Sequence, residues 1–536
     1  MLTALDVVVL VVYGVGVIAF GLRAGGRQRT TQDYFLGGRD LPWWAVCFSV
    51  VATETSTLTV IGVPVVAYFG SFTFLQLAIG YLIGRVVVAS VLLPRYFRGE
   101  LQTAYAFLGD RFGDTTRAVA SVTFLVTRLL ADGVRLFATA IPIQVIARAA
   151  GLDVGYPAVI LAIGVVTAAY TYVGGLKAVV WMDVVQMGIY VGGAVLALVL
   201  LWPALAAALP EALAAGKLTV VDWGTGGLSE VLTQPYAFPV AVIGGAFFAM
   251  ASHGTDQLIV QRILACRTLA EGRRAMVWSG VVVALQFALF LGVGVGLWAF
   301  YGAAPLAELG LGRGDELFPL FILNEMPAGL RGLLFAGIIA AAMSTLSSSL
   351  NALAGSTLMD LVERLGGRRP DEAAALRLSR VLTLVWAAVF VGFATLFTGL
   401  DNPVVELGLG IAGFTYGGLL GAFALGLLVR RARQADALVA FAVTIAALTA
   451  VIFGVWWSGA AEAWVWAWRP SAEDREAGAL SAVAWPLYPL VGVAVSLVVG
   501  GLLSLRHPAG SDSAPPRADA APPRSAGGAG WGGSRS

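Results

Sequence analysis

Long apolar runs dominate this sequence and leave few ways for it to fold. Each of thirteen stretches is close to the roughly 20 apolar residues that a helix needs to cross a bilayer. Because lipid offers no hydrogen-bond partners, the backbone of such a run must satisfy itself, which a helix does within one segment. The predicted spans are 3–22, 42–69, 72–94, 118–147, 155–174, 178–207, 235–256, 277–302, 326–358, 378–399, 403–429, 437–458 and 484–505.

Charge is scarce throughout the chain. Only 12% of the 536 residues are charged and 58% are hydrophobic, whereas soluble proteins keep about a quarter of their residues charged. We therefore expect an all-α integral membrane protein that crosses the plasma (inner) membrane several times, with the lipid bilayer as its main partner. The net charge of +2 gives no reason to expect nucleic acid as a partner.

The basic residues of the loops predict an orientation. If the N-terminus lies outside, most loop Lys and Arg fall on the cytoplasmic side, including the clusters at 23–39, 364–380 and 430–433. This bias follows the positive-inside rule, and one helix more or fewer would spoil it. We predict about 13 transmembrane helices within residues 1–505, with the N-terminus outside and the C-terminus cytoplasmic. Residues 506–536, rich in Pro, Gly, Ala and Ser, are expected to form a disordered cytoplasmic tail.

Two of the spans are interrupted by polar residues. Span 42–69 contains VATETST at 51–57, and span 235–256 contains ASHGTD at 251–256. The first opens a group of five spans (42–207) and the second opens another (235–429), so the two groups are oppositely oriented. Inverted-repeat transporters place broken helices at such matching positions, where the unwound backbone binds ions or substrate. Gly and Pro are also common in ordinary membrane helices, which is the simpler explanation of either break.

Four motifs resemble the sodium:solute symporter family, which includes sodium/proline, sodium/glucose and sodium/pantothenate cotransporters. They are DYFLGGRDLPWW at 33–44, YVGGLKAVVWMDVVQ at 172–186, GTDQLIVQR at 254–262 and AAMSTLS at 341–347. The resemblance implies a five-plus-five inverted repeat, preceded by helix 3–22 and followed by helices 437–458 and 484–505. It also implies sodium-coupled symport of a small polar organic solute by alternating access. On that reading the protein is not an enzyme, and sodium is its coupling ion with no other cofactor.

The resemblance also implies a sodium site. Ala341, Ser344, Thr345 and Ser348 share one helix face by their spacing. Ser344 and Thr345 would supply hydroxyls and Ala341 a carbonyl, while Ala52 and Thr55 in the first broken span would supply two more carbonyls. Ser348 would assist ion coupling. Ser and Thr in membrane helices also commonly bond back to their own helix, which remains the alternative.

Glu54 is the only acidic residue in its span. A carboxylate at this depth is costly and therefore suggests a function. Glu54 could assist the sodium ion, carry a proton, or pair with an intramembrane arginine.

A second charged group lies on span 118–147. Arg128, Asp132 and Arg135 are spaced four and three residues apart, which brings them near one helix face. Asp132 can neutralise only one of the two arginines, so the remaining positive charge could attract a carboxylate-bearing solute. An internal charge network is the alternative. Arg85 is expected to extend toward the cytoplasmic interface.

The remaining candidates lie at or near the breaks. The substrate candidates are Ser56, Thr57, Gln76, Asp132, Arg135, Ser252 and His253, although a lone histidine is more often structural than a proton relay. The residues expected to act in gating or structure are Asp183, Asp256 and Gln257. Trp residues near span ends fit interfacial anchoring.

Two rival functions stay open at this point. A proton-coupled symporter would use Glu54, and its uptake would follow a pH gradient without sodium. A membrane sensor or channel on the same scaffold is the other rival, although the chain shows neither a kinase-like domain after the last helix nor a filter-like repeat. The identity of the solute does not follow from these patterns.

Overall fold

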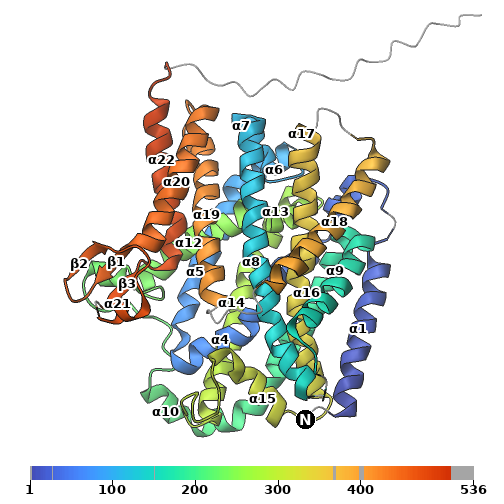
Figure 1. Ribbon diagram of the computed structural model, residues 1–536, viewed down its shortest axis with the longest axis vertical. Helices are drawn as coiled ribbons and strands as arrows, with labels where there is room; N and C mark the ends of the chain where they lie inside the picture. The colour runs from blue at the N-terminus through green and yellow to red at the C-terminus, as the bar shows by residue number, and fades with distance from the viewer. Residues whose placement is uncertain are drawn as a thin grey trace, which may run out of the picture.

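The fold is a bundle of long helices, seen in a computed structural model (Figure 1). The structure describes residues 3–26, 28–99, 101–149, 151, 153–365, 370–396, 404–477 and 479–508. The end of span 378–399, the start of span 403–429 and most of the tail at 506–536 lie outside these ranges. The described chain begins at one end of the bundle and its last helix runs toward the opposite end, as an odd number of crossings requires (Figure 1).

Helices occupy every predicted span. The long helices up to residue 207 are α1 (Ala4–Ala24), α3 (Trp43–Glu54), α4 (Thr57–Phe69), α5 (Leu75–Val87), α8 (Asp114–Ala149) and α9 (Tyr156–Ala207). Those that follow are α12 (Phe238–Gly254), α13 (Gln257–Leu264), α14 (Leu269–Phe300), α16 (Leu330–Ser356), α18 (Glu372–Thr395), α19 (Val404–Leu428), α20 (Gln434–Gly454) and α22 (Tyr488–Ser504). Shorter helices are α2 (Thr31–Leu36), α6 (Leu93–Arg98), α7 (Ala106–Phe112), α10 (Leu209–Ala214), α11 (Leu228–Val231), α15 (Leu317–Glu325), α17 (Glu363–Leu365) and α21 (Ala472–Ala477).

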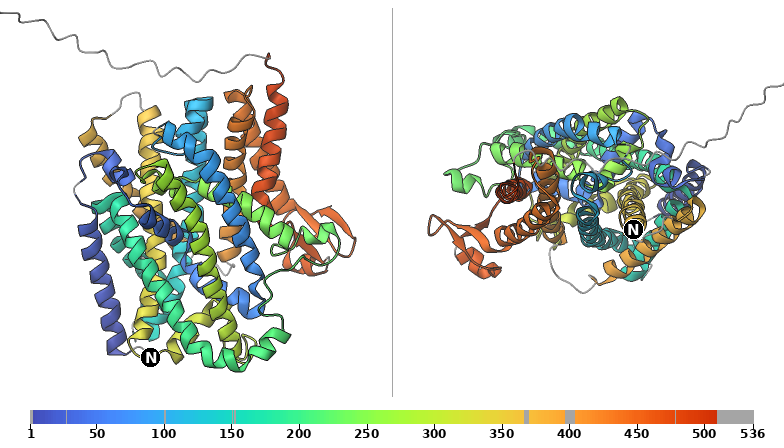
Figure 2. Two further views of the ribbon diagram at one scale, coloured as in Figure 1. Left: turned by 180° about the vertical axis from the view of Figure 1, so that it is seen from behind. Right: turned by 90° about the horizontal axis from the view of Figure 1, so that it is seen from above.

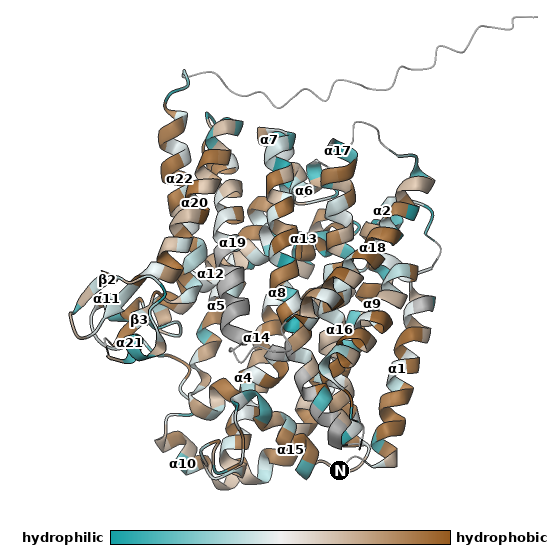
Figure 3. Cartoon of the chain, in the orientation of Figure 1, coloured by the Kyte–Doolittle hydropathy of each residue, from teal (hydrophilic) through white to brown (hydrophobic). Residues whose placement is uncertain are grey.

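Hydrophobic residues make up much of the long helices of this bundle (Figure 3). Within the described ranges, eight helices are long and apolar enough to cross a membrane, or ten if each of two bent pairs forms one span. That result supports a multi-pass membrane protein. The predicted total of about 13 crossings and the N-out orientation stay predictions.

Both predicted breaks are present. α3 and α4 meet at 64° across Thr55 and Ser56, and α12 and α13 meet at 62° across Thr255 and Asp256. In the second pair, helix α12 continues unbroken through Gly244 and Gly245, so the interruption falls at the polar residues instead.

Two predicted spans, 155–174 and 178–207, form the single helix α9 with a kink. The kink is at Gly175, where φ is +52°. A side chain there would be strained by the left-handed backbone, and its Cβ would lie 2.5 Å from the carbonyl oxygen of Tyr34. The GlyGly pair in this motif therefore allows a sharp bend without a loop.

A small sheet departs from the all-α expectation. Strands β1 (Val455–Ser458), β2 (Ala463–Trp466) and β3 (Leu480–Ala482) form an antiparallel sheet in the order β2-β1-β3. The predicted span 437–458 therefore ends early, because α20 stops at Gly454 and the Val-Trp-Trp run that follows favours a strand.

Close packing of α5 against α12 depends on two glycines one helical turn apart. A Cβ at Gly80 would lie 2.4 Å from the carbonyl oxygen of Val242, and a Cβ at Gly84 would lie 2.3 Å from that of Ala246. Such small-xxx-small pairs let membrane helices approach closely.

We predict that Gly84→Ala lowers the melting temperature of the purified protein in detergent, because the added methyl group must push α5 away from α12. Overpacking of this kind costs about 1–3 kcal/mol. Gly188→Ala is the matched control, since no atom lies within 4 Å of its added Cβ. Equal melting temperatures for the two variants would contradict this account of the α5–α12 contact.

Candidate functional site

The first break exposes backbone at the centre of the molecule. Thr55 and Ser56 are extended (φ −80°, ψ 98° and φ −89°, ψ 170°), so α3 ends at Glu54 and α4 begins at Thr57. The last carbonyls of a helix lack donors within that helix. The break therefore leaves backbone oxygens near Ala52 and Thr55 free for other partners, although Thr55 itself still donates its amide to Val51.

Helix α16 lies directly against this break. The Thr53 Oγ1 and Ser348 Oγ atoms are 3.2 Å apart, and Thr57 Oγ1 donates to the Ile338 carbonyl at 3.3 Å. Thr345 Oγ1 donates to the Ala341 carbonyl at 3.2 Å. The two stretches proposed to share a sodium ion are thus neighbours, and all five proposed ligands are buried. Their role as sodium ligands stays a prediction.

A cavity opens beside the same break. The space between its lining residues is about 260 Å³ when the open solvent at its mouth is included. Three elements line it: the start of α4, the middle of α8 and the middle of α16. The lining residues are Ser56, Thr57, Asp132, Arg135, Leu136, Thr139, Ala342, Thr345 and Leu346. Four of the substrate candidates and one proposed sodium ligand therefore face one space.

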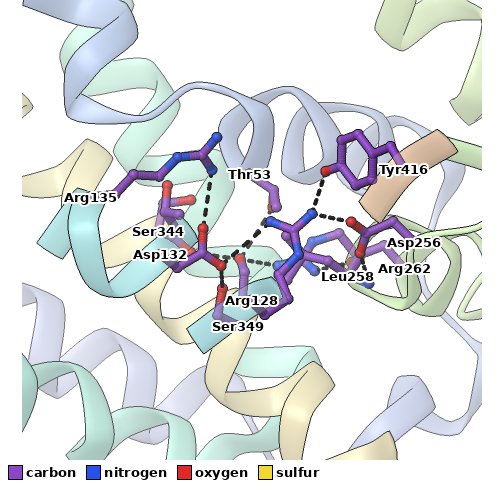
Figure 4. Close-up of polar contacts among 12 residues, drawn as sticks. Thr53, Arg128, Asp132, Arg135, Asp256, Leu258, Arg262, Ser344, Ser349 and Tyr416 are labelled. Atoms are coloured by element: carbon purple, nitrogen blue, oxygen red, sulfur yellow. Dashed lines mark hydrogen bonds and ion pairs between the residues drawn. The ribbon is translucent and has the colours of Figure 1, made fainter. Parts of the chain in front are cut away.

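The charges on α8 form a network with α13 rather than an isolated positive patch (Figure 4). Arg128 forms an ion pair with Asp256, and Asp132 lies 3.2 Å from Arg135 and 3.5 Å from Arg128. The expected excess of positive charge was wrong, because Asp256 from the second broken helix supplies a second carboxylate. Tyr416 accepts a further hydrogen bond from Arg128 at 2.5 Å, and Ser349 donates to Asp132 at 2.5 Å.

Arg135 is the most accessible member of this network. Its side chain is 28% exposed, whereas those of Arg128 and Asp132 are 5% and 1% exposed. Among the described residues, the Arg135 guanidinium makes one hydrogen bond, which its Nη1 donates to Asp132. The other donors of its guanidinium are therefore available at the cavity.

Asp183 and Arg262 form a second buried centre. Asp183 accepts hydrogen bonds from Ser49 (2.5 Å), Ser344 (2.6 Å) and Arg262 (3.3 Å). Arg262 also donates to Ser348. These contacts join α3, α9, α13 and α16, which is the arrangement expected of a structural or gating residue. The Ser344 hydroxyl faces Asp183 here and not the first break.

Asp256 and Gln257 hold the second break in place. Asp256 Oδ1 caps α13 by accepting from the Leu258 amide at 2.9 Å. Gln257 Oε1 accepts from the Ala104 amide at 2.7 Å. Both contacts fit the predicted hinge role.

Glu54 pairs with Arg85 at the first break. Arg85 is fully buried and also donates to Ser279 at 2.7 Å, so its expected extension to the cytoplasmic interface was wrong. The carboxylate of Glu54 holds it inside. The His253 Nε2 atom lies 3.6 Å from the same carboxylate, and its Nδ1 lies 2.8 Å from Ser252 Oγ.

Three substrate candidates lie away from the cavity. Ser252 and His253 belong to the Glu54 cluster instead. Gln76 donates to the Tyr236 carbonyl at 2.6 Å and accepts from the Asp222 amide at 3.2 Å, so it fastens α5 to the loop before α12. These hydrogen bonds occupy the side-chain amide of Gln76, with which a solute would have to bond.

Sequence reasoning missed several participants. Arg262 follows the predicted span 235–256 in the sequence, yet it is fully buried; its position within the apolar run LIVQRIL was the available signal. Thr139, one turn after Arg135, shares the cavity and donates to Thr57 at 3.2 Å. Gln286 donates to the Thr55 hydroxyl at 2.7 Å, and no motif marked it.

Comparisons with known proteins agree with this architecture. The model of the sodium:solute symporter family matches residues 34–444. The sodium/sialic acid symporter SiaT of Proteus mirabilis is 28% identical over 471 residues, covering 83% of this chain and 89% of SiaT. The human sodium-coupled monocarboxylate transporter 1 is 31% identical over 424 residues, covering 78% of this chain and 67% of that protein.

A solved structure shows the same fold. A Na⁺-coupled sialic acid symporter in a substrate-bound outward-open state superposes with a TM-score of 0.77 at 25% identity, covering 94% of this chain and 98% of that one. The family match spans both broken helices, the cavity and α16. This chain belongs to the sodium:solute symporter family.

Proposed function

We propose that this protein is a sodium-coupled symporter that imports a small carboxylate-bearing solute across the plasma membrane. The observation that carries the proposal is the single cavity shared by the first break, α16 and Arg135. Sodium would bind between Ala52, Thr55, Ala341, Ser344 and Thr345. The solute would bind in the cavity beside it.

Sodium and solute would influence each other through these shared residues. Thr345 is both a proposed sodium ligand and part of the cavity wall, and Ser56 and Thr57 continue directly from the unwound backbone. A ligand shifts a conformational equilibrium only by its different affinity for the two states. Sodium that orders the break would favour the state with a formed cavity, and the coupling of the two ligands would be reciprocal.

Arg135 supports a carboxylate as the recognised group. Its guanidinium offers two parallel donors, a geometry that matches a carboxylate. The network around it is neutral overall, so recognition would depend on these directed hydrogen bonds more than on long-range attraction. Relatives named for sialic acid and monocarboxylate transport also favour this class of solute.

The solute prediction is tested by uptake into liposomes that contain the purified protein under an inward sodium gradient. A panel of monocarboxylates, sialic acid, neutral sugars and amino acids identifies the solute. For the best solute, Arg135→Gln should raise the KM about 10- to 100-fold, since a hydrogen bond to a charged group contributes about 1.5–3 kcal/mol.

Arg313→Gln is the matched control for Arg135→Gln, because Arg313 is exposed in the loop between α14 and α15. An unchanged KM in Arg135→Gln would exclude Arg135 from solute binding. Preference for an uncharged solute would exclude the carboxylate.

The sodium site is tested by the sodium concentration that gives half-maximal uptake. Ser344→Ala and Thr345→Ala should each raise that concentration. Thr345→Ala removes an oxygen beside the proposed ion, and Ser344→Ala removes a hydroxyl that would turn from Asp183 to the ion when sodium binds. Ser379→Ala is the control, because its buried hydroxyl donates to the Ala375 carbonyl of its own helix, α18. If sodium dependence stays unchanged in both variants, neither hydroxyl binds the ion.

The ion pair of Glu54 with Arg85 weighs against the proton-carrying role of Glu54. The Glu54 carboxylate already has a charged partner in Arg85, as expected if it pairs with an intramembrane arginine. We predict that Glu54→Gln lowers the melting temperature more than the double variant Glu54→Gln with Arg85→Met does. An unpaired buried charge costs about 3–5 kcal/mol, whereas removal of both partners avoids most of that cost.

Uptake under an imposed proton gradient without sodium is the companion measurement. We expect no accumulation under that condition in the unmodified protein. Accumulation that follows the proton gradient and disappears in Glu54→Gln would favour the proton-coupled alternative.

A further inference from the structure

The small sheet forms a separate element between the last two described spans. β1, β2, β3 and α21 lie between α20 and α22, beyond the family match that ends at residue 444. The sheet projects sideways from the helix bundle in two perpendicular views (Figures 1 and 2). It therefore lies beside the bundle and not over the central cavity.

The two edges of this sheet differ in chemistry. β2 forms one edge, and the tryptophans on it and just after it are exposed: Trp464 by 36%, Trp466 by 64% and Trp468 by 55%. The other edge is β3, against which α21 packs. α21 carries the exposed acidic residues Glu473, Asp474 and Glu476. The β2 edge with its tryptophans therefore suits the interface between lipid and water, and the β3 edge with α21 suits water.

Chain geometry keeps the aromatic edge near the end of a membrane span. β1 begins at the residue after α20, and β2 pairs with it along all four of its residues. Four strand residues extend only about 13 Å, and the polar interface of a bilayer is about 5–8 Å thick on each side. The Trp466 ring also lies over Gly454, the last residue of α20.

The exposed aromatic edge continues the lipid-facing surface of α20. Val443 and Phe453 on that helix are 40% and 37% exposed. The rings of Phe453 and Trp468 are 6.1 Å apart, and those of Trp466 and Trp468 stack at the same distance. The apolar surface therefore runs from the side of the span to the edge of the sheet, where the Arg469 guanidinium lies 5.8 Å from the centroid of the Phe453 ring.

We propose that the tryptophan edge, defined as Trp464, Trp466 and Trp468, docks into the phospholipid headgroup region beside α20. The rings lie among the headgroups and uppermost acyl carbons, and α21 stays in water. Tryptophan is enriched at this depth because its ring is apolar and its N–H is polar. The proposal does not rest on sodium coupling or on the solute.

Single-cysteine labelling tests this placement in nanodiscs of phosphatidylcholine. The two native cysteines, Cys47 and Cys266, are 2% and 0% exposed, so an added exposed cysteine is labelled selectively. The probe is a fluorophore whose emission shifts to the blue in apolar surroundings. Trp466→Cys and Trp468→Cys place it on the tryptophan edge, and Glu473→Cys places it on the acidic edge as the matched control.

We expect a blue shift for the probe at both tryptophan positions, and loss of its emission when the lipids carry a nitroxide near the headgroup. The probe at position 473 should show neither change, but a water-soluble quencher should reach it. Equal behaviour at both edges, or quenching of the probes at 466 and 468 only from water, would overturn the proposal. Solute uptake by each labelled variant shows that it is folded, and labelled wild-type protein gives the background.

Discussion

Pairing of buried charges is the constraint on which the centre of this protein depends. Arg128 with Asp256, Arg262 with Asp183, and Arg85 with Glu54 all lie within an otherwise apolar bundle. A charge left alone at such depth would cost several kcal/mol. Each pair therefore links a residue of a broken helix to a neighbouring helix. These ion pairs hold both breaks in place within the bundle.

This arrangement explains why the polar breaks are tolerated. Unwound backbone in a membrane protein persists only where protein or water surrounds it. Here α16 covers the first break with hydroxyl groups, and Asp256 both caps α13 and neutralises Arg128. What remains open is the small space between Ser56, Thr345 and Arg135, which is where we propose that the transported ligands meet.

The sequence predicted the helical architecture well because membrane helices obey a simple length rule. Both breaks were also predicted, since polar residues such as those at 51–57 stand out within apolar runs. The first break and α16 are neighbours, as predicted. That prediction came from the motif resemblance more than from the periodicity of the sequence. The kink at Gly175 depends on a left-handed backbone, and the sheet after Gly454 depends on strand pairing. The length of an apolar run predicts neither.

Pairing between distant segments was the part that local patterns could not predict. Asp256 lies far from Arg128 in the chain, so the charge on α8 was overestimated. Arg85 was expected to extend to the cytoplasmic interface, and Arg262 follows the end of the predicted span 235–256. Carboxylates on other helices hold both inside. Gln76, Ser252 and His253 were chosen for polarity and position, yet none of them lines the cavity. Gln76 bonds to the loop before α12, His253 lies beside Glu54, and Ser252 bonds within α12.

The central claim is that one sodium ion is held between the unwound residues 52–55 and the hydroxyl-bearing turn of α16. An experimental structure determined in sodium, at a resolution that separates ions from side chains, tests it most directly. We predict density bounded by the carbonyls of Ala52, Thr55 and Ala341 and by the hydroxyls of Ser344 and Thr345, which disappears when choline replaces sodium. A structure in sodium in which protein atoms fill that space, and the ion is bound elsewhere, would contradict the account.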